Sequence, residues 1–315
     1  MSDIIMFFDY MISGQNMFYQ NIEANKTKTV FLMIVFMAVV IAIGWAVGVV
    51  MGSGSEFALV IAIIISFVLV WASYYYSDKM VIASVGAHPV DPYEDAYLIN
   101  VVEGLSIAAG FPKVPKAYIM ETPALNAFAT GRNPDNAAVC VTRGLLQKLN
   151  RQELEGVIGH EMSHIRNYDT LIMTITAVLV GGVALLSQFM FRWMFWGGRG
   201  RRSDNDRGGG PAQLIIFVLA IILLILAPIL VNLMKLALSR TREYLADASA
   251  VQLTRNPQGL IGALKKISGD VEPMEKASEA TAHLFIANPF KGKAVVNLLS
   301  THPPIEDRIA ALEKM

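Results

Sequence analysis

Long apolar runs divide this chain into parts suited to a membrane and parts suited to water. A helix needs about 20 residues to cross a hydrocarbon core of ~30 Å, and four runs reach that length. They are Thr29–Met51, Phe57–Tyr76, Leu171–Trp196 and Ala212–Leu238. The first two contain no charge and are joined by a short Gly/Ser-rich stretch, so they predict a tight helical hairpin. In the second pair, Pro228 and charged residues near the ends also allow buried core helices.

The polar parts predict a domain of helices and short strands. Residues Asp91–Gly110 have the pattern of a helix. Asn150 and Glu153 have the spacing of a capping box, which predicts the start of another helix. Between these helices lie three short β-type runs separated by turn residues. The runs are Ala117–Met120, Ala127–Thr130 and Ala137–Thr142.

Composition agrees with a membrane protein. Hydrophobic residues make up 54 % of the chain and charged residues 17 %, whereas soluble domains contain about 25 % charged residues. The 26 basic and 26 acidic residues cancel, so no global field favours nucleic acid as a partner. The single cysteine, Cys140, excludes an intrachain disulfide, and its apolar neighbours predict a buried strand residue.

The run His160-Glu161-Met162-Ser163-His164 carries the most specific chemistry. In a helix both imidazoles share one face and can bind one metal ion, with Glu161 beside them. This constellation is typical of zinc metallopeptidases. One zinc ion per chain would lower the pKa of its water toward ~7, and Glu161 would take the proton as the water attacks a peptide carbonyl. The alternative is a helix surface with two unrelated histidines.

A catalytic zinc site needs a third protein ligand and an open position for water. Segment 239–247 reads as a helix and follows a membrane-length segment that returns the chain to the first motif. Glu243 and Asp247 share one face of that helix. One carboxylate can therefore bind the metal while the other accepts the free N–H of a ligand imidazole. The alternative is an ordinary charged helix with Arg/Glu pairs.

Three motifs in order give the chain a family resemblance. They are His-Glu-x-x-His at 160–164, Ser-Arg-x-x-Glu-Tyr-x-Ala-Asp at 239–247 and His-Pro-Pro-x-x-x-Arg at 302–308. The chain thereby resembles the membrane-bound HtpX-type zinc metalloproteases, relatives of the CAAX prenyl proteases, over residues 30–315. The resemblance implies that His160, His164 and Glu243 bind zinc, that Glu161 is the general base, and that Asp247 supports a ligand.

The fold class follows from the resemblance and the apolar runs together. We expect an α-helical membrane protein with a mainly α, α+β zincin-like metallopeptidase domain and four transmembrane or membrane-embedded helices. Its parts are an N-terminal extension (1–28), a transmembrane hairpin (29–76), a catalytic subdomain with the zinc-binding helix (77–170), a second membrane hairpin (171–238) with an Arg/Gly-rich loop (197–211), and a second catalytic subdomain with the third ligand (239–315). Residues 1–28 do not have the pattern of a signal peptide.

The resemblance also implies groups that contact the substrate. His302 and Arg308 match positions that contact substrate or the developing oxyanion, where one charge-assisted donor is worth on the order of 3–4 kcal/mol. Both residues have structural alternatives, because His302 precedes two prolines and can cap a turn. Arg308 can pair with Glu306 or Asp307.

The run Asn126-Ala127-Phe128-Ala129 is similar to the edge strand that lies beside the cleft in this family. A free strand edge can pair with the backbone of an extended substrate without requiring particular side chains. The alternative is a plain three-stranded sheet that covers the motif helix. His88 and His283 lie in no motif, and we expect ordinary structural roles for both.

The distribution of basic residues predicts an orientation. Lys26 and Lys28 precede the first span and the first hairpin loop has no basic residue, so the N-terminus, residues 77–170 and the active site should face the cytoplasm from the cytoplasmic (inner) membrane. If both later segments cross, the Arg-rich loop 197–211 would lie outside, in conflict with this tendency. Either the second hairpin is re-entrant or the first hairpin overrides its charge.

The function predicted from the sequence is that of an integral membrane zinc endopeptidase acting on misfolded or damaged membrane proteins. Its partners would be membrane-protein or peptide substrates and the lipid bilayer, with no nucleic acid. The alternative is a membrane scaffold or regulatory pseudopeptidase that binds without cleaving, which the intact Glu161 disfavours. Cleavage of prenylated CAAX substrates is disfavoured because four spans are too few for a large enclosed chamber.

Overall fold

The structure is a computed structural model that describes residues 20, 22–42, 44–45, 55–196, 240–290 and 302–315. The predicted membrane segment Ala212–Leu238 and the Arg/Gly-rich loop lie outside the described residues, as does most of the N-terminal extension.

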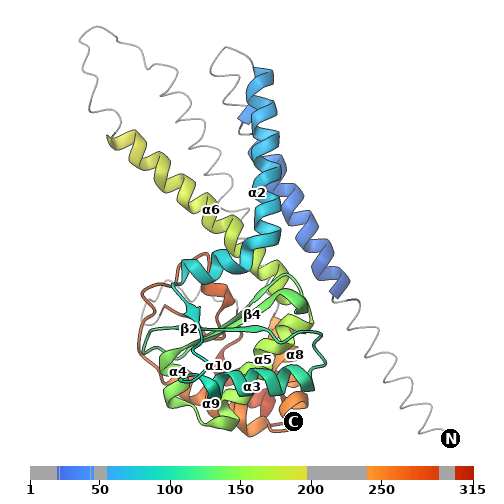
Figure 1. The fold of residues 1–315 in the computed structure, drawn as a ribbon, viewed down its shortest axis with the longest axis vertical. Helices are drawn as coiled ribbons and strands as arrows, with labels where there is room; N and C mark the ends of the chain where they lie inside the picture. The colour runs from blue at the N-terminus through green and yellow to red at the C-terminus, as the bar shows by residue number, and fades with distance from the viewer. Residues whose placement is uncertain (1–19, 21, 43, 46–54, 197–239, 291–301) are drawn as a thin grey trace, which may run out of the picture.

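Apolar helices project together from one side of a globular domain (Figure 1). The described residues contain two helical stretches long and apolar enough to cross a membrane, Ile22–Ala42 and Leu59–Ser84 of α2 (Ser55–Ser84). Helix α6 (Asp169–Trp196) adds a third if it is counted with the helix before it, from which it is bent by 84°. The four predicted membrane helices are therefore not confirmed. Large apolar side chains on α2, such as Phe67, are exposed, as lipid contact requires.

A four-stranded sheet in the order β1-β2-β4-β3 lies beside the base of these helices. The strands are β1 (His88–Pro89), β2 (Lys116–Met120), β3 (Ala127–Gly131) and β4 (Ala137–Thr142). β2 and β4 are parallel, whereas the outer pairs are antiparallel. The three predicted strands are confirmed, and β1 is an addition. Val139 and Val141 pack with α5 (Arg151–Arg166), while Cys140 packs with α2 and α6, so both faces are covered and the strand is apolar throughout.

Further helices surround α5. They are α3 (Ala96–Ala108), α4 (Arg143–Lys148), α8 (Arg240–Thr254), α9 (Pro257–Ser268) and α10 (Ile305–Leu312), with short 3-10 turns η1 (Pro134–Asn136) and η3 (Ala282–Leu284). Helix α3 begins later than the predicted Asp91. The Asp91 carboxylate accepts the backbone N–H groups of Tyr93 and Glu94, which forms a separate turn before the helix.

Helix α5 forms the centre of the domain. Its predicted capping box is confirmed, because Asn150 Oδ1 accepts the Glu153 N–H at 3.0 Å and Glu153 Oε2 accepts the Asn150 N–H at 2.8 Å. Every residue from Gly156 to Ile165 is buried. A helix covered on all sides holds its polar side chains in the interior of the domain, which is where the histidines of the first motif lie.

Glycines allow α5 to lie close to its neighbours. A Cβ on Gly156 would stand 2.6 Å from the backbone N of Leu260 in α9, and a Cβ on Gly259 would stand 2.3 Å from the carbonyl O of Gln152. Gly159 faces α8, where a Cβ would stand at ordinary contact distance, 3.4 Å from Thr254 Cγ2. The second motif is on α8, so this close packing brings its carboxylates toward the first motif.

We predict that Gly156→Ala lowers the free energy of unfolding by about 2 kcal/mol, because overpacking against backbone typically costs 1–3 kcal/mol. Gly104→Ala is the matched control. Gly104 also lies within a helix, but a Cβ there meets nothing within 4 Å, so that variant should be unchanged or more stable by up to ~1 kcal/mol. Thermal unfolding of detergent-solubilised protein measures both, and equal melting temperatures would contradict the close contact.

Candidate metal centre

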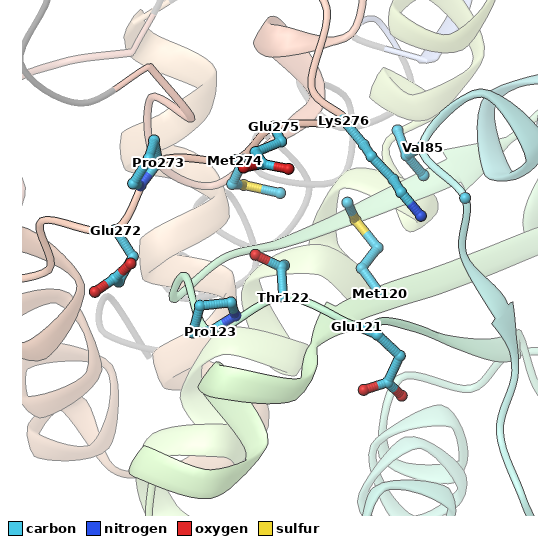
Figure 2. A pocket seen from close by; sticks show the side chains of 11 residues that line it. Val85, Met120, Glu121, Thr122, Pro123, Glu272, Pro273, Met274, Glu275 and Lys276 are labelled. Atoms are coloured by element: carbon cyan, nitrogen blue, oxygen red, sulfur yellow. The ribbon is translucent and has the colours of Figure 1, made fainter.

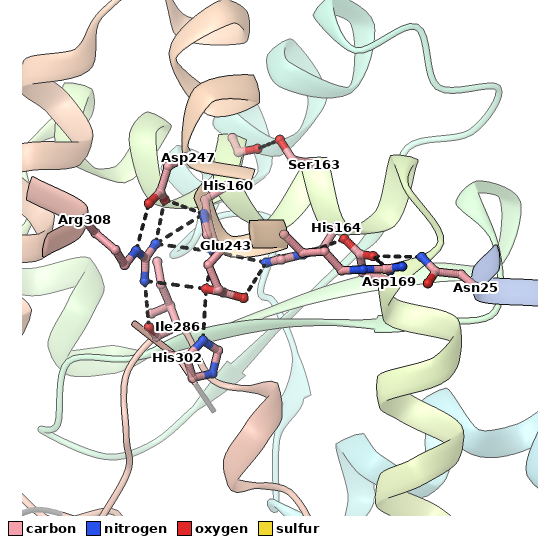
Figure 3. A network of polar contacts seen from close by, with 12 residues as sticks. Asn25, His160, Ser163, His164, Asp169, Glu243, Asp247, Ile286, His302 and Arg308 are labelled. Carbon is pink, nitrogen blue, oxygen red and sulfur yellow. Dashed lines mark hydrogen bonds and ion pairs between the residues drawn. The ribbon is translucent and has the colours of Figure 1, made fainter. Parts of the chain in front are cut away.

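The two motif histidines point into one space from successive turns of α5 (Figure 3). The Nε2 atoms of His160 and His164 are 3.1 Å apart, and both side chains are buried. Glu243 reaches the same space from α8, with Oε1 3.5 Å from His164 Nε2 and Oε2 3.7 Å from His160 Nε2. Atoms bound at 2.0–2.1 Å to one tetrahedral ion stand about 3.3 Å apart. The spacing of these three side chains therefore fits a zinc ion.

Hydrogen bonds on the far side of each ring fix how the imidazoles are protonated. His160 Nδ1 is 2.9 Å from Asp247 Oδ1, and His164 Nδ1 is 3.0 Å from Asp169 Oδ2. Because a carboxylate accepts a hydrogen bond, both Nδ1 atoms carry hydrogen, and the two Nε2 atoms face the space between the rings. Although burial lowers the pKa of His164, Asp169 and Glu243 raise it to about 9, so a proton on His164 Nε2 bridges to His160 Nε2 when no metal is bound. A metal ion that displaces this proton finds two nitrogen lone pairs directed at it, so the donor set suits a metal ion.

The charges of the surrounding residues lead to the same conclusion. Four buried carboxylates gather here, those of Glu161, Asp169, Glu243 and Asp247. The two guanidinium groups, Arg242 and Arg308, pair with only two of these four carboxyl groups, Asp169 and Asp247. Buried negative charge is costly unless it is compensated, so the surroundings favour a cation.

Asp169 is the site residue that the sequence analysis missed. It is the first residue of α6, and the sharp turn after α5 places its carboxylate beneath the second motif histidine. Its other oxygen, Oδ1, accepts hydrogen bonds from Asn25 and Arg242. The available signal was a carboxylate five residues after His164, since ligand imidazoles usually donate their second N–H to such a group.

Glu161 is buried beside the ligands but is not one of the three clustered side chains. Its carboxylate accepts the backbone N–H of Ala129 on β3. Burial raises the pKa of Glu161 to about 7, and the nearby Glu243 also raises it. A carboxylate with this pKa is suited to accepting a proton near neutral pH.

Glu243 is a carboxylate rather than a neutral acid. Burial alone would raise its pKa, but the imidazole of His302 and those of the two motif histidines hold the pKa well below its usual range. His302 Nδ1 lies 2.9 Å from Glu243 Oε2. The structure therefore brings His302 into the site through its contact with a ligand, and its proposed contact with substrate stays a prediction.

Arg308 is completely buried and faces the ligands' supporting residues. Its Nε and Nη2 donate to the two oxygens of Asp247 at 2.9 and 2.6 Å, and its Nη1 donates to the Ile286 carbonyl at 3.2 Å. Arg308 therefore pairs with Asp247 and not with Glu306 or Asp307, its alternative partners. In this arrangement Arg308 orients Asp247 and, through it, His160.

The predicted substrate edge, Asn126–Ala129, adjoins the site but contacts part of the protein itself. The Ala127 carbonyl accepts the Ile286 N–H at 2.9 Å, and the Asn126 side chain donates to the Ala287 carbonyl at 2.9 Å. Phe128 is bridged to Phe285 as an antiparallel strand partner. Segment 285–287 therefore lies along the outer edge of β3.

The histidines outside the motifs have structural contacts, as expected. His283 is buried and its Nε2 is 3.0 Å from the Met173 carbonyl, while His88 is exposed and pairs with Glu121 at 3.0 Å. A cavity of about 270 Å³ lies elsewhere, between residues 120–123 at the end of β2 and residues 272–276 (Figure 2). None of its lining residues is a metal ligand, so this cavity is not the metal centre.

Comparisons with known proteins identify the family to which the chain is similar. The model of the family described as "Peptidase family M48" matches residues 92–315. A "Protease HtpX homolog" of Lactobacillus helveticus (strain DPC 4571) is 43 % identical over 300 residues, covering 95 % of this chain and 100 % of that protein. One of Listeria monocytogenes serotype 4a (strain HCC23) is 47 % identical with the same coverage. The crystal structure of S. mikatae Ste24p aligns at 16 % identity and a TM-score of 0.47, covering 94 % of this chain and 67 % of that one.

We predict that the purified protein binds about one zinc ion per chain. Substitution of a ligand should weaken zinc binding more than substitution of a residue that supports a ligand. His160→Ala and Glu243→Ala remove ligands and should abolish stoichiometric binding. Asp169→Asn keeps the size of the side chain but loses the charged acceptor for His164, and should weaken zinc affinity about 10–100-fold. Chelator competition measures the dissociation constants. Asp135→Asn, in the exposed turn η1, is the control, and an effect of that size in the control would remove Asp169 from the site.

Proposed function

The chain belongs to peptidase family M48 and is a membrane zinc metalloprotease, and on that premise we propose how its residues cleave a peptide bond. The observation that carries the proposal is the buried group of His160, His164 and Glu243 with Glu161 beside it. Zinc held by these three ligands supplies a Lewis acid that polarises a carbonyl and lowers the pKa of water to ~7.

In this proposal Glu161 is the general base. It takes a proton from the attacking water and then gives it to the leaving amine, because a buried carboxyl with a pKa of about 7 can do both near neutral pH. His302 contacts Glu243 through its Nδ1 atom. We propose that His302 also donates a hydrogen bond to the oxyanion of the substrate. Arg308 keeps the positioning role that its contacts with Asp247 support.

We further propose that the substrates are misfolded or damaged membrane proteins. The exposed apolar faces of the membrane-type helices stand next to the catalytic domain, so a substrate in the same bilayer lies within reach of the site. The runner-up, a scaffold that binds without cleaving, is disfavoured because base, ligands and supporting carboxylates are all in place.

Glu161→Gln should retain zinc and lose cleavage by about 10²–10⁴-fold, since it removes a proton acceptor and not a ligand. Glu155→Gln, a partly exposed glutamate on the same helix, is the matched control and should cleave at the wild-type rate. The measurement is proteolysis of an unfolded membrane protein by detergent-solubilised enzyme, with and without a chelator. Wild-type rates in Glu161→Gln would exclude it as the base.

We propose that an extended substrate binds by main-chain pairing with the β3 edge at Asn126–Ala129, next to the base. Segment 285–287 lies on that edge, so the proposal requires this segment to move aside when substrate enters. Main-chain pairing also explains why a degradative protease would accept many sequences.

A reversible disulfide tests whether substrate must replace segment 285–287 on the β3 edge. Residues 127 and 286 are opposed across the bridged edge, where antiparallel partners have Cα atoms about 5.5 Å apart, a separation that a disulfide can span. Ala127→Cys with Ile286→Cys, in a Cys140→Ser background, should be inactive when oxidised and active again after reduction. Equal activity in both states would show that substrate does not need this edge.

The orientation of the catalytic domain is also a proposal. Because Glu243 contacts His164, residues 77–170 and 239–315 share one side of the membrane, and the charge pattern supports the cytoplasmic side. Thiols introduced by Lys113→Cys and Lys265→Cys, both exposed, should be protected from an impermeant reagent in intact cells and react after lysis. Labelling of either one from outside would reverse the orientation.

A further inference from the structure

A residue of the N-terminal helix reaches the supporting layer of the metal centre. Asn25 is completely buried, although it lies in the first turn of the membrane-type helix Ile22–Ala42. Its Nδ2 is 2.9 Å from the Asn167 carbonyl O and 2.8 Å from Asp169 Oδ1. These partners are 142 and 144 residues away in the chain, and Figure 3 shows Asn25 at the end of the network that contains His164.

The orientation of the Asn25 carboxamide follows from its partners. Both partners are acceptors, one a carbonyl and one a carboxylate, and the amide NH₂ has two N–H groups to give. The opposite orientation would place the amide oxygen against a negative charge. Asn25 therefore acts as a double donor that ties the Asn167 backbone to the Asp169 side chain.

The turn that Asn25 holds is strained. Residues 167–169 join α5 and α6 through an 84° bend, and Tyr168 has φ +58°, a left-handed conformation that is strained for a bulky residue. Lys26 Nζ lies 5.1 Å from the centre of the Tyr168 ring, a cation–π contact. Two consecutive residues of the N-terminal helix thus hold this turn.

The carboxylate of Asp169 transmits this restraint to the metal ligand. Its Oδ1 accepts from Asn25 and from Arg242 of α8, which fixes the plane of the group. Its Oδ2 then accepts from His164 Nδ1 at 3.0 Å. The ring orientation of His164, and therefore the direction of its Nε2 lone pair, depends on where Asp169 is held.

We propose that Asn25 is a positioning residue of the zinc site, so that the N-terminal helix is part of the catalytic apparatus as well as a membrane anchor. The proposal rests on the zinc site described under the proposed function. It assigns Asn25 no contact with metal or substrate, because it acts through Asp169 and the turn at Tyr168.

The test compares Asn25→Ala and Asn25→Asp in the full-length, detergent-solubilised enzyme. The alanine variant loses both donors. The aspartate variant keeps the size of the side chain but turns a carboxylate toward Asp169, so it reports on the interaction if the alanine variant does not fold. Thr27→Ala, on the exposed side of the same helix, is the control. Zinc affinity is measured by chelator competition, and the ligand geometry by the visible absorption of the Co²⁺-substituted protein.

Each Asn25 variant should bind zinc about 10-fold more weakly than wild type, with an altered Co²⁺ spectrum, whereas Thr27→Ala should match wild type. When Asn25→Ala is added to Asp169→Asn, zinc affinity should change less than 2-fold further, because the Asp169 carboxylate through which Asn25 acts on the metal ligand is already absent. Wild-type affinity in either folded Asn25 variant would overturn the proposal, as would an equal loss on the Asp169→Asn background. If wild type itself binds no zinc, the proposed function fails instead.

Discussion

The metal centre depends on two imidazole Nε2 atoms that face each other at 3.1 Å in the buried interior of the domain. Both atoms can bind one metal ion only if each ring keeps its hydrogen on Nδ1. Asp247 and Asp169 favour this state by accepting the Nδ1 hydrogens. Each carboxylate is in turn paired with an arginine, Arg308 or Arg242, so that neither is left as an unpaired buried charge.

These supporting residues come from parts of the chain that are far apart. Helix α5 carries the histidines, α6 begins with Asp169, α8 carries Glu243 and Asp247, and α10 carries Arg308. The metal centre therefore joins the apolar helices to the globular domain. Gly156 of α5 and Gly259 of α9 let the backbones of these two helices approach more closely than a side chain would allow.

Much of the site could be predicted because its signals are local. The spacing of His160 and His164 fixes their common face, and the capping box of Asn150 sets where their helix begins. The strands around Cys140 were visible as continuous apolar runs. The same local logic paired Glu243 with Asp247, which share one helix face.

What the sequence could not predict depends on contacts between distant residues. Asp169 becomes a partner of His164 only through a bend at a left-handed Tyr168, a conformation with no sequence signal. The covering of the β3 edge by Ile286 is a tertiary contact that no periodicity encodes. Hydrophobic length predicts four membrane helices; the described residues contain two, or three with the bent pair, and the segment 212–238 lies outside them.

X-ray absorption at the zinc edge tests the central claim most directly, because it reports the atoms bound to the metal in the intact protein. The arrangement of His160, His164 and Glu243 predicts only nitrogen and oxygen neighbours at about 2.0–2.1 Å, with the outer-shell scattering of two imidazoles. Glu161→Gln should leave that spectrum unchanged. A sulfur neighbour at about 2.3 Å, or scattering from a number of imidazoles other than two, would contradict the site.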